Sequence, residues 1–187
     1  TGALYHDVGK LHAPNWFIEN QDGSKNPHDE IDDPLKSAKV LQAHVDEGLK
    51  FARKNRLPKP IADFIPEHQG TLKMGYFLHK AEEKKLNFNE SDFRYNGPIP
   101  QSKETAILML ADGCEAALRA MDINASDYEA LETISKIINS RQIDGQLDKS
   151  NLSKGEVFLI KKSFLNVWKR IRHRRIQYPT TKNNTFS

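Results

Sequence analysis

The sequence predicts an all-α protein, and three observations support that prediction. Apolar residues recur at steps of three and four over several long segments, which is the spacing of one buried helix face. Residue types that cap helices stand directly before these segments. No segment alternates apolar and polar residues for long enough to predict a sheet. A chain of 187 residues is long enough to bury a sizeable core within one domain.

The composition is that of a rather polar chain with no membrane-spanning segment. Its mean hydropathy is −0.68, no apolar run is long enough to cross a bilayer, and no signal-peptide pattern stands at its start. Because the chain begins with Thr1 and not with methionine, we expect a fragment whose missing portion could include a membrane anchor. We expect one domain over residues 1–176 and a disordered tail over 177–187, which is polar and lacks periodicity.

The single cysteine, Cys114, limits the redox chemistry of the chain. One cysteine excludes an intramolecular disulfide and is consistent with a reducing compartment. Because Cys114 stands within an apolar helical pattern, we expect a buried thiol that takes no part in catalysis.

The first segments of the chain combine a helix end with a long loop. Residues 1–7 predict the last turns of a helix whose beginning precedes the sequence. Residues 11–33 contain Pro14, Gly23 and Pro27 among many Asn and Asp residues, a composition that favours irregular structure. A loop of this length in a compact domain is usually functional or mobile.

The first full helix is predicted to begin after residue 33. Asp33 has the residue type of an N-cap, and Pro34 suits the first helical position. His44 lies at the margin of the buried face of this helix. That face is formed at helical spacing by Leu35, Ala38, Leu41, Val45, Leu49 and Ala52.

Two shorter helices come next. One is predicted from about Pro60 to His68, with Pro66 bending it or marking its last turn. The other is an amphipathic helix that follows Gly70 and ends in the charged residues 82–85.

Three longer helices are predicted after a loop at residues 87–101. Ser102 caps a strongly apolar helix, and Ser126 and Ser153 each open a capping box with a glutamate three residues later. Asp112 lies inside the apolar pattern of the first of these helices. An ionised carboxylate is costly to bury there unless a cation or a metal ion compensates its charge.

Five residues are candidate metal ligands: His6, Asp7, His44, His68 and Asp112. Imidazole nitrogens and carboxylate oxygens suit divalent transition metals, and a carboxylate can bridge two ions. Each candidate lies at a predicted helix end or at the inner margin of a predicted helix. Metal sites in helical bundles are formed by inward side chains of several helices. One histidine near an apolar face is more often a core residue, but five such positions on separate segments favour a metal centre.

The order of these residues resembles that of the HD-domain metal-dependent phosphohydrolases. Longer sequence words narrow the resemblance to the cytoplasmic HD domain of the seven-transmembrane HD phosphodiesterases, which hydrolyse cyclic di-AMP. The resemblance extends from about residue 1 to residue 178. The words are LYHDVGK (4–10), FIENQ (17–21), NPHD (26–29), FIPEHQGT (64–71), FRYNGP (93–98), PQSKETA (100–106) and MLAD (109–112).

This resemblance implies an HD-domain helical bundle with two divalent ions, manganese or iron being expected, in the helical core. The five candidate residues would be the ligands, with Asp7 bridging the two ions. A water activated by the metals would convert cyclic di-AMP to linear pApA. Lys10 would act with Asp7 in catalysis by offsetting charge at the scissile phosphate.

The sequence departs from the family pattern in two places. The family has a further histidine ligand one helix upstream of the His-Asp pair, before the first residue of this chain. Related enzymes often have a second histidine where this chain has Gln69. Because an amide oxygen is a weaker ligand than imidazole, we expect a looser second metal site.

Other polar and aromatic residues are candidates for substrate binding. Arg94 and Lys103 could contact a phosphate or a base, and each could equally be an ordinary surface cation. Asn20 and Asn26 could read adenine edges. The aromatic residues that could stack on a base, although loop aromatics more often cover the core, are Trp16, Phe17 and Tyr95.

Three alternatives to cyclic di-AMP hydrolysis stay open from the sequence. The chain could be an HD hydrolase for another nucleotide. It could be a nucleotide-binding HD module without turnover, because Gln69 and the absent upstream histidine weaken the metal site. The basic run at residues 169–175 could bind nucleic acid, but cations that complement a helix dipole are the more common explanation of such a run.

The resemblance also implies partners and a location. It implies a cyclic dinucleotide substrate and no nucleic-acid partner. It implies a cytoplasmic domain of an inner-membrane bacterial protein, which contacts the membrane only through a portion absent from this sequence. The oligomeric state stays open.

Overall fold

The computed structural model describes residues 1–21 and 25–175, and the predicted disordered tail at 177–187 lies outside them. Within these ranges every regular element is helical, apart from one isolated antiparallel bridge between Lys73 and Arg94. The prediction of an all-α chain is therefore confirmed. None of the helices in the described ranges combines the length and the apolar composition that crossing a bilayer requires.

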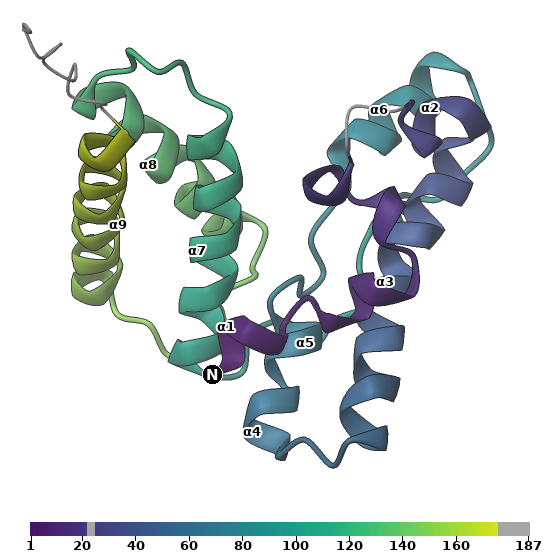
Figure 1. Cartoon of the computed structure of the whole chain (residues 1–187), viewed down its shortest axis with the longest axis horizontal. Coiled ribbons are helices and arrows are strands. Elements are labelled where there is room, and N and C mark those ends of the chain that lie inside the picture. Colours follow the sequence, from purple (N-terminus) through teal and green to yellow (C-terminus); the bar gives the residue numbers. More distant parts are fainter. Residues whose placement is uncertain (22–24, 176–187) are drawn as a thin grey trace, which may run out of the picture.

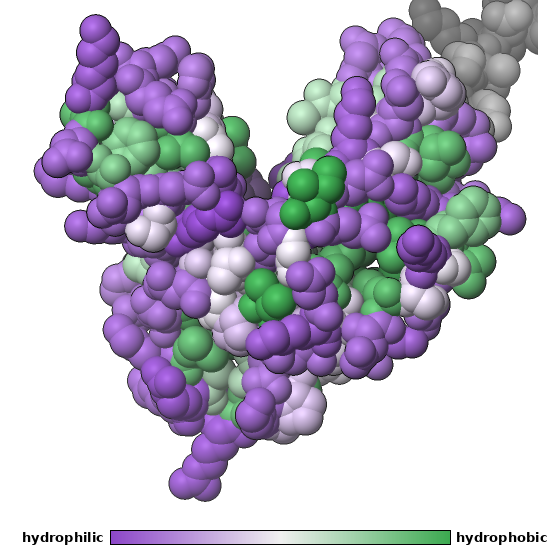
Figure 2. All heavy atoms as spheres, turned by 180° about the vertical axis from the view of Figure 1, so that it is seen from behind, coloured by the Kyte–Doolittle hydropathy of each residue, from purple (hydrophilic) through white to green (hydrophobic). Residues whose placement is uncertain are grey.

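The helices form two groups that meet at one end of the molecule (Figure 1). The C-terminal lobe contains the long helices α7 (Lys103–Arg119), α8 (Asp127–Ile143) and α9 (Lys154–Arg175). Figure 2, seen from behind, shows a hollow between the two groups. The N-terminal lobe contains α1 (Gly2–Tyr5), α2 (Pro27–Ile31), α3 (Pro34–Lys54), α4 (Lys59–Ala62), α5 (Phe64–Glu67) and α6 (Gly75–Glu83).

Helix α3 is the central element of the N-terminal lobe, and it begins where the sequence predicts. The Asp33 side chain accepts a hydrogen bond from the backbone N–H of Lys36 at 3.1 Å, and Pro34 occupies the first helical position. The buried face of α3 packs against α5 and α6. Because His44 lies on this face, the helix carries its imidazole into the interior.

The prediction of irregular structure throughout residues 11–33 is wrong for part of that segment. Asn26 accepts a hydrogen bond from the backbone N–H of His28 at 3.1 Å, and Pro27 occupies the first position of α2. From the sequence this Asn-Pro pair predicts a turn, but here Asn26 is an N-cap and Pro27 takes the first helical position, which proline favours. Three short 3-10 helices also form in the segment that precedes α2, namely η1 (Val8–His12), η2 (Pro14–Trp16) and η3 (Ile18–Asn20).

The helix predicted from Pro60 to His68 is two short helices, α4 and α5, which are separated at Asp63. Pro66 explains the interruption, because it has no N–H to donate to the carbonyl of Ala62 four residues earlier. The break turns α5 so that its last residues face α7, with which it packs. A further 3-10 helix, η4 (Glu90–Phe93), forms within the predicted loop at residues 87–101.

The C-terminal lobe is held together by one apolar core, and its helices start at the predicted caps. Ser102, Ser126 and Ser153 each bond to a backbone N–H three residues later. Burial raises the pKa of the Cys114 thiol to about 11, in agreement with a buried, unreactive cysteine. The core residues are Leu110, Cys114, Ile134, Ile138, Val157 and Ile160.

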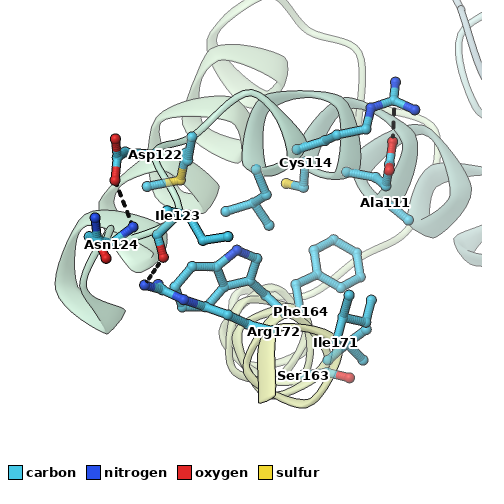
Figure 3. Close-up of a pocket in the computed structure, with 15 residues that line it drawn as sticks. Ala111, Cys114, Asp122, Ile123, Asn124, Ser163, Phe164, Ile171 and Arg172 are labelled. Carbon is cyan, nitrogen blue, oxygen red and sulfur yellow. Dashed lines mark hydrogen bonds and ion pairs between the residues drawn. The ribbon is translucent and has the colours of Figure 1, made fainter. Parts of the chain in front are cut away.

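A cavity of about 890 Å³ lies between α7 and α9 (Figure 3). Arg172 is one of the lining residues, and its guanidinium donates to the backbone carbonyls of Ile123 and Ala125. Most of the walls are apolar, with contributions from Leu118, Met121, Phe164, Val167, Trp168 and Ile171.

Candidate metal centre

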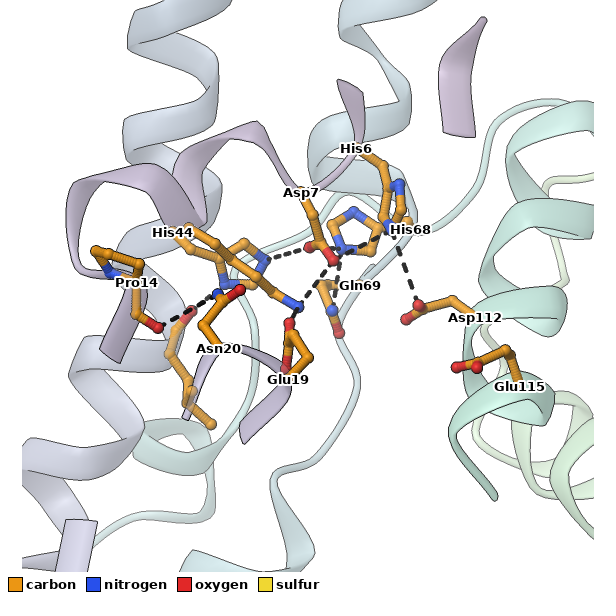
Figure 4. A network of polar contacts seen from close by, with 12 residues as sticks. His6, Asp7, Pro14, Glu19, Asn20, His44, His68, Gln69, Asp112 and Glu115 are labelled. Atoms are coloured by element: carbon orange, nitrogen blue, oxygen red, sulfur yellow. Dashed lines mark hydrogen bonds and ion pairs between the residues drawn. The ribbon is translucent and has the colours of Figure 1, made fainter. Parts of the chain in front are cut away.

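The carboxylate of Asp7 lies at the centre of a cluster of imidazoles (Figure 4). His6 Nε2 lies 3.2 Å from Asp7 Oδ2, and His68 Nε2 lies 3.3 Å from Asp7 Oδ1. His44 Nε2 lies 3.6 Å from the same Oδ1 atom. The donor atoms of His6, Asp7 and His68 all lie within 4.8 Å of one another, so that one ion could contact all three.

The three imidazoles share one orientation. In each ring Nδ1 bonds to a backbone carbonyl three residues earlier, and because a carbonyl only accepts, Nδ1 is the donor. In the neutral ring Nε2 therefore carries the lone pair, and this atom faces Asp7. This is how metal-binding histidines are usually oriented. The bonds join His6 to Ala3 at 2.8 Å, His44 to Leu41 at 2.5 Å and His68 to Ile65 at 2.7 Å.

Two buried atoms of the cluster fit a metal ion. Asp7 Oδ1 and His44 Nε2 are buried and have no hydrogen-bond partner among the described residues. A buried polar atom without a partner costs about 1–3 kcal/mol. An ion between these atoms would remove that cost, and a set of imidazole nitrogens with a carboxylate suits a divalent transition metal.

Asp112 brings a second carboxylate to the cluster from the C-terminal lobe. Its Oδ1 lies 3.8 Å from His6 Nε2, and Figure 4 shows the side chain pointing from α7 towards His6. Burial disfavours the charged carboxylate, but the neighbouring imidazole of His6 outweighs burial and lowers the pKa of Asp112. The structure therefore brings all five predicted ligand residues together, from segments that lie far apart in the sequence.

The carboxylates change the titration of the imidazoles around them. Burial opposes protonation of His6, but the nearby carboxylates of Asp112 and Asp7 outweigh burial and raise its pKa to about 10. His44 is buried beside the imidazole of His68, and its pKa falls to about 4. Since a ligand imidazole must be neutral, an ion at His6 would require the release of a proton from this ring.

Lys10, the predicted catalytic cation, lies beside Asp7. Its Nζ lies 2.8 Å from Asp7 Oδ2 and also pairs with Glu19. Burial favours the neutral amine, but the charge of Asp7 and then that of Glu19 raise the pKa of Lys10. Sequence reasoning missed Glu19, because a loop carboxylate nine residues from Lys10 gives no periodic signal.

Gln69 reaches the same centre. Its side-chain Nε2 lies 3.0 Å from His68 Nε2 and donates to the lone pair that faces the cluster. An ion that contacts His68 would have to displace this amide. Gln69 therefore competes for the ligand atom in addition to being a weak ligand itself.

The approach of η1 to α3 places Asp7 near His44. A Cβ atom on Gly9 would lie 1.8 Å from the carbonyl oxygen of His44 and 2.5 Å from the backbone nitrogen of Gly48. Only glycine permits this contact between the two backbones. Gly9 therefore holds the His-Asp segment against the helix that carries His44.

The aromatic residues predicted to stack on a base have their rings against histidine rings in the structure. The rings of Phe17 and Tyr95 lie edge-on to His44, with centroids at 5.5 and 5.9 Å. Trp16 lies 5.1 Å from the ring of His28. Contact of any of these rings with a base stays a prediction.

The four predicted substrate-binding polar residues all have partners within the chain, and their contact with substrate stays a prediction. Arg94 pairs with Asp144 at 3.0 Å and with Glu90 at 2.9 Å. The remaining contacts are Lys103 with Glu156, Asn20 with the carbonyl of Pro14, and Asn26 with the first turn of α2.

The fold is helical, and its candidate ligands are a His-Asp pair, two further histidines and a distant aspartate. This combination is typical of one class of helical metal-binding domain. The profile of the HD domain matches residues 1–117, and the chain belongs to the HD-domain family.

Similar proteins narrow the comparison within this family. The chain is 37% identical to the cyclic-di-AMP phosphodiesterase PgpH of Listeria monocytogenes over 98% of its length and 39% identical to PgpH of Bacillus subtilis over 96%. It is 48% identical to an uncharacterized protein of Synechocystis sp. over 96% of its length. The chain spans about a quarter of the length of these relatives, 25%, 25% and 23% respectively.

A solved structure has the same fold. The crystal structure of the Listeria monocytogenes PgpH HD domain in complex with cyclic-di-AMP superimposes with a TM-score of 0.86 at 35% identity. The match covers 91% of this chain and 78% of that one. The same domain without a named ligand gives a TM-score of 0.85.

Proposed function

We propose that this chain is a metal-dependent phosphodiesterase that hydrolyses cyclic di-AMP to linear pApA. The observation that carries the proposal is the convergence of three imidazole Nε2 atoms on the carboxylate of Asp7. The likeness to PgpH HD domains, one of them solved with cyclic-di-AMP, supports the choice of substrate.

The proposed ligands are His6, Asp7, His44, His68 and Asp112, with Asp7 between two ions. Divalent ions bound there would polarise the phosphodiester and lower the pKa of water. Manganese or iron are the proposed metals, because mixed imidazole and carboxylate ligation suits both.

Lys10 has a separate role in the proposed reaction. Hydrolysis forms a bond between phosphorus and a water oxygen and breaks the bond to a ribose 3′ oxygen, which leaves a 5′-phosphate and a 3′-hydroxyl. Negative charge grows on the phosphoryl oxygens during this exchange. Asp7 and Glu19 hold the Lys10 ammonium at the centre, where it would offset that charge.

Hydrolysis of cyclic di-AMP by the purified chain tests the proposal. With Mn²⁺ or Fe²⁺ we expect pApA, identified by chromatography and mass spectrometry, and no product from Asp7→Asn. A panel of other cyclic dinucleotides and nucleoside phosphates is the control. Faster turnover of one of these would show an HD hydrolase with another substrate.

A second candidate function is nucleotide binding without turnover. The observation that favours it is the hydrogen bond from Gln69 to His68 Nε2, which occupies a proposed ligand atom. In that case the chain would bind cyclic di-AMP but yield no pApA after metal reconstitution. Gln69→His would then raise the Mn²⁺ affinity, because imidazole is the stronger ligand.

We further propose that the chain is the cytoplasmic part of a longer bacterial membrane protein. Its coverage of about a quarter of the PgpH relatives is compatible with this. Fractionation of cells that produce the full-length protein would test it, and recovery outside the membrane fraction would contradict it.

A further inference from the structure

Glu67 lies next to the metal centre in the sequence, but its carboxylate points to another helix. It is the last residue of α5, directly before His68, and is only 5% exposed. Its Oε2 accepts a hydrogen bond from Thr105 Oγ1 at 2.6 Å and another from the backbone N–H of Gln101 at 2.8 Å. Both donors lie at the start of α7. Two hydrogen bonds therefore join the end of α5 to the first turn of α7 and the residue just before its N-cap.

Thr105 serves α7 in two ways. Its hydroxyl oxygen accepts from the backbone N–H of Ser102 at 3.4 Å, and its own backbone N–H donates to Ser102 Oγ at 3.2 Å. Of the contacts of this hydroxyl, the one to Glu67 is the shortest. Thr105 is 2% exposed, so that its hydroxyl makes these contacts away from the surface. One hydroxyl therefore closes the first turn of α7 and fastens that turn to α5.

The geometry of an α-helix connects this contact to the metal centre. Asp112 follows Thr105 by seven residues, which is two turns along the same face of α7. Asp112 is also the proposed ligand that the C-terminal lobe supplies, 3.8 Å from His6. If the first turn of α7 is fixed, both the position of Asp112 along the helix axis and its direction around that axis are fixed as well.

We propose that Glu67 and Thr105 form a clamp that positions Asp112 at the metal centre. Glu67 and Thr105 are thus positioning residues for the reaction, and Glu67 has a role that differs from that of its neighbour His68. The inference rests on the proposed metal centre.

A double-mutant cycle on Mn²⁺ affinity tests the clamp. We expect Glu67→Leu, which removes the acceptor of both bonds, and Thr105→Val each to weaken binding of Mn²⁺ to the full chain by about tenfold, measured by calorimetry. Added to Asp112→Asn, either change has no further effect, because the clamp acts through Asp112. Losses that multiply in the double variants would overturn the proposal. Thr105→Ser keeps the hydroxyl and retains the affinity.

The capping box of α8 provides a matched control. Ser126 and Glu129 bond to each other as a cap, but Ser126 lies outside the contact between the lobes. We expect Ser126→Ala to lower the melting temperature, since it removes a cap, and to leave Mn²⁺ affinity unchanged. An equal loss of affinity in both variants would mean that any weakened cap disturbs the centre, and would overturn the clamp.

A distance measurement tests the clamp without metal or substrate. Spin labels at Lys39→Cys on α3 and Lys136→Cys on α8 report the separation of the lobes, since both side chains are exposed and Cys114 is buried. We expect one narrow distance distribution, which Thr105→Val broadens. An unchanged distribution would overturn the clamp. A chain that keeps this response but binds no Mn²⁺ would overturn the proposed function alone.

Discussion

At the scale of single residues, Asp7 is the side chain that the candidate ligands His6, His44 and His68 and the cation Lys10 all contact. The imidazoles of His6 and His68, close to its carboxylate, and the charge of Lys10 outweigh burial and hold the pKa of Asp7 far below its usual range. Its residue type and position next to His6 are visible in the sequence, so the cluster could be predicted. The hydrogen bond of Gln69 and the pairing of Glu19 could not, because each depends on the path of the backbone.

Metal binding should stabilise the fold, because Asp7 Oδ1 and His44 Nε2 are buried without partners in the described structure. An ion at a hundredfold excess over its dissociation constant adds about 2.7 kcal/mol. For a chain of this size we expect Mn²⁺ to raise the melting temperature by roughly 5–10 °C in differential scanning fluorimetry. Chelation with EDTA should reverse the rise. Asp7→Asn is the control, and an equal rise in that variant would contradict binding at this centre.

Gly9→Ala should damage both stability and metal binding. The added methyl group would meet the His44 carbonyl at 1.8 Å, so η1 must move away from α3. Overpacking of this kind costs about 1–3 kcal/mol, measurable by urea unfolding. Gly75→Ala is the matched control, because its Cβ would meet nothing within 4 Å. If both variants unfolded at the same urea concentration, close backbone approach would not be what Gly9 provides.

At the scale of elements, helix starts were more predictable than helix ends and breaks. Asp33 and Ser102 mark their helices because a cap is a local interaction between residues three positions apart. Helix α2 was missed because Asn26 and Pro27 also occur in turns, and tertiary packing decides between the two outcomes. The split between α4 and α5 follows from Pro66, but its exact position depends on packing against α7.

The cap of α9 should give the protein a pH-dependent stability. Bonds with Lys103 and Ser153 lower the pKa of Glu156 to about 2, from about 4.5 in an unfolded chain. A lowered pKa contributes stability that is complete above the unfolded value and is lost as the pH falls towards the folded one. We therefore expect Glu156→Gln to be less stable than the parent chain at neutral pH, and the difference to shrink between about pH 4.5 and pH 2.

Urea unfolding of both chains across this pH range measures that difference. Asp46→Asn, an exposed carboxylate in the middle of α3, is the control and should show a much smaller effect. A stability difference that stays constant from neutral pH down to about pH 2 would rule out ionisation of Glu156 as its source.

At the scale of the whole molecule, a few polar contacts join the two lobes. Gln146 is fully buried and bonds to the backbone and hydroxyl of Thr71, and Arg94 pairs with Asp144. Residues 71 and 146 are separated by 75 positions. Such contacts leave no periodic pattern, which is why the sequence predicts the helices but not the lobes or the cavity beside α9.

Gln146→Leu should weaken the contact between the lobes. It leaves the half-buried Thr71 N–H and hydroxyl without their partner, at a cost of up to about 1–3 kcal/mol in the free energy of unfolding. Urea denaturation followed by circular dichroism measures this loss. Gln142→Leu, one turn earlier in α8, is the control. A stability equal to that of the parent chain would mean that Thr71 finds other partners.

The side chains around Asp7 lie far apart in the sequence, and this determines when the binding site can be completed during synthesis. His6 and Asp112 stand 106 residues apart, and His44 and His68 lie between them. During synthesis, which proceeds from the N-terminus, the ribosome must release α7 before the fifth side chain can join the others. Contacts that close such long loops form late and slowly. Full occupancy by metal would therefore mark chains that have finished folding, and a nascent chain would carry an incomplete binding site.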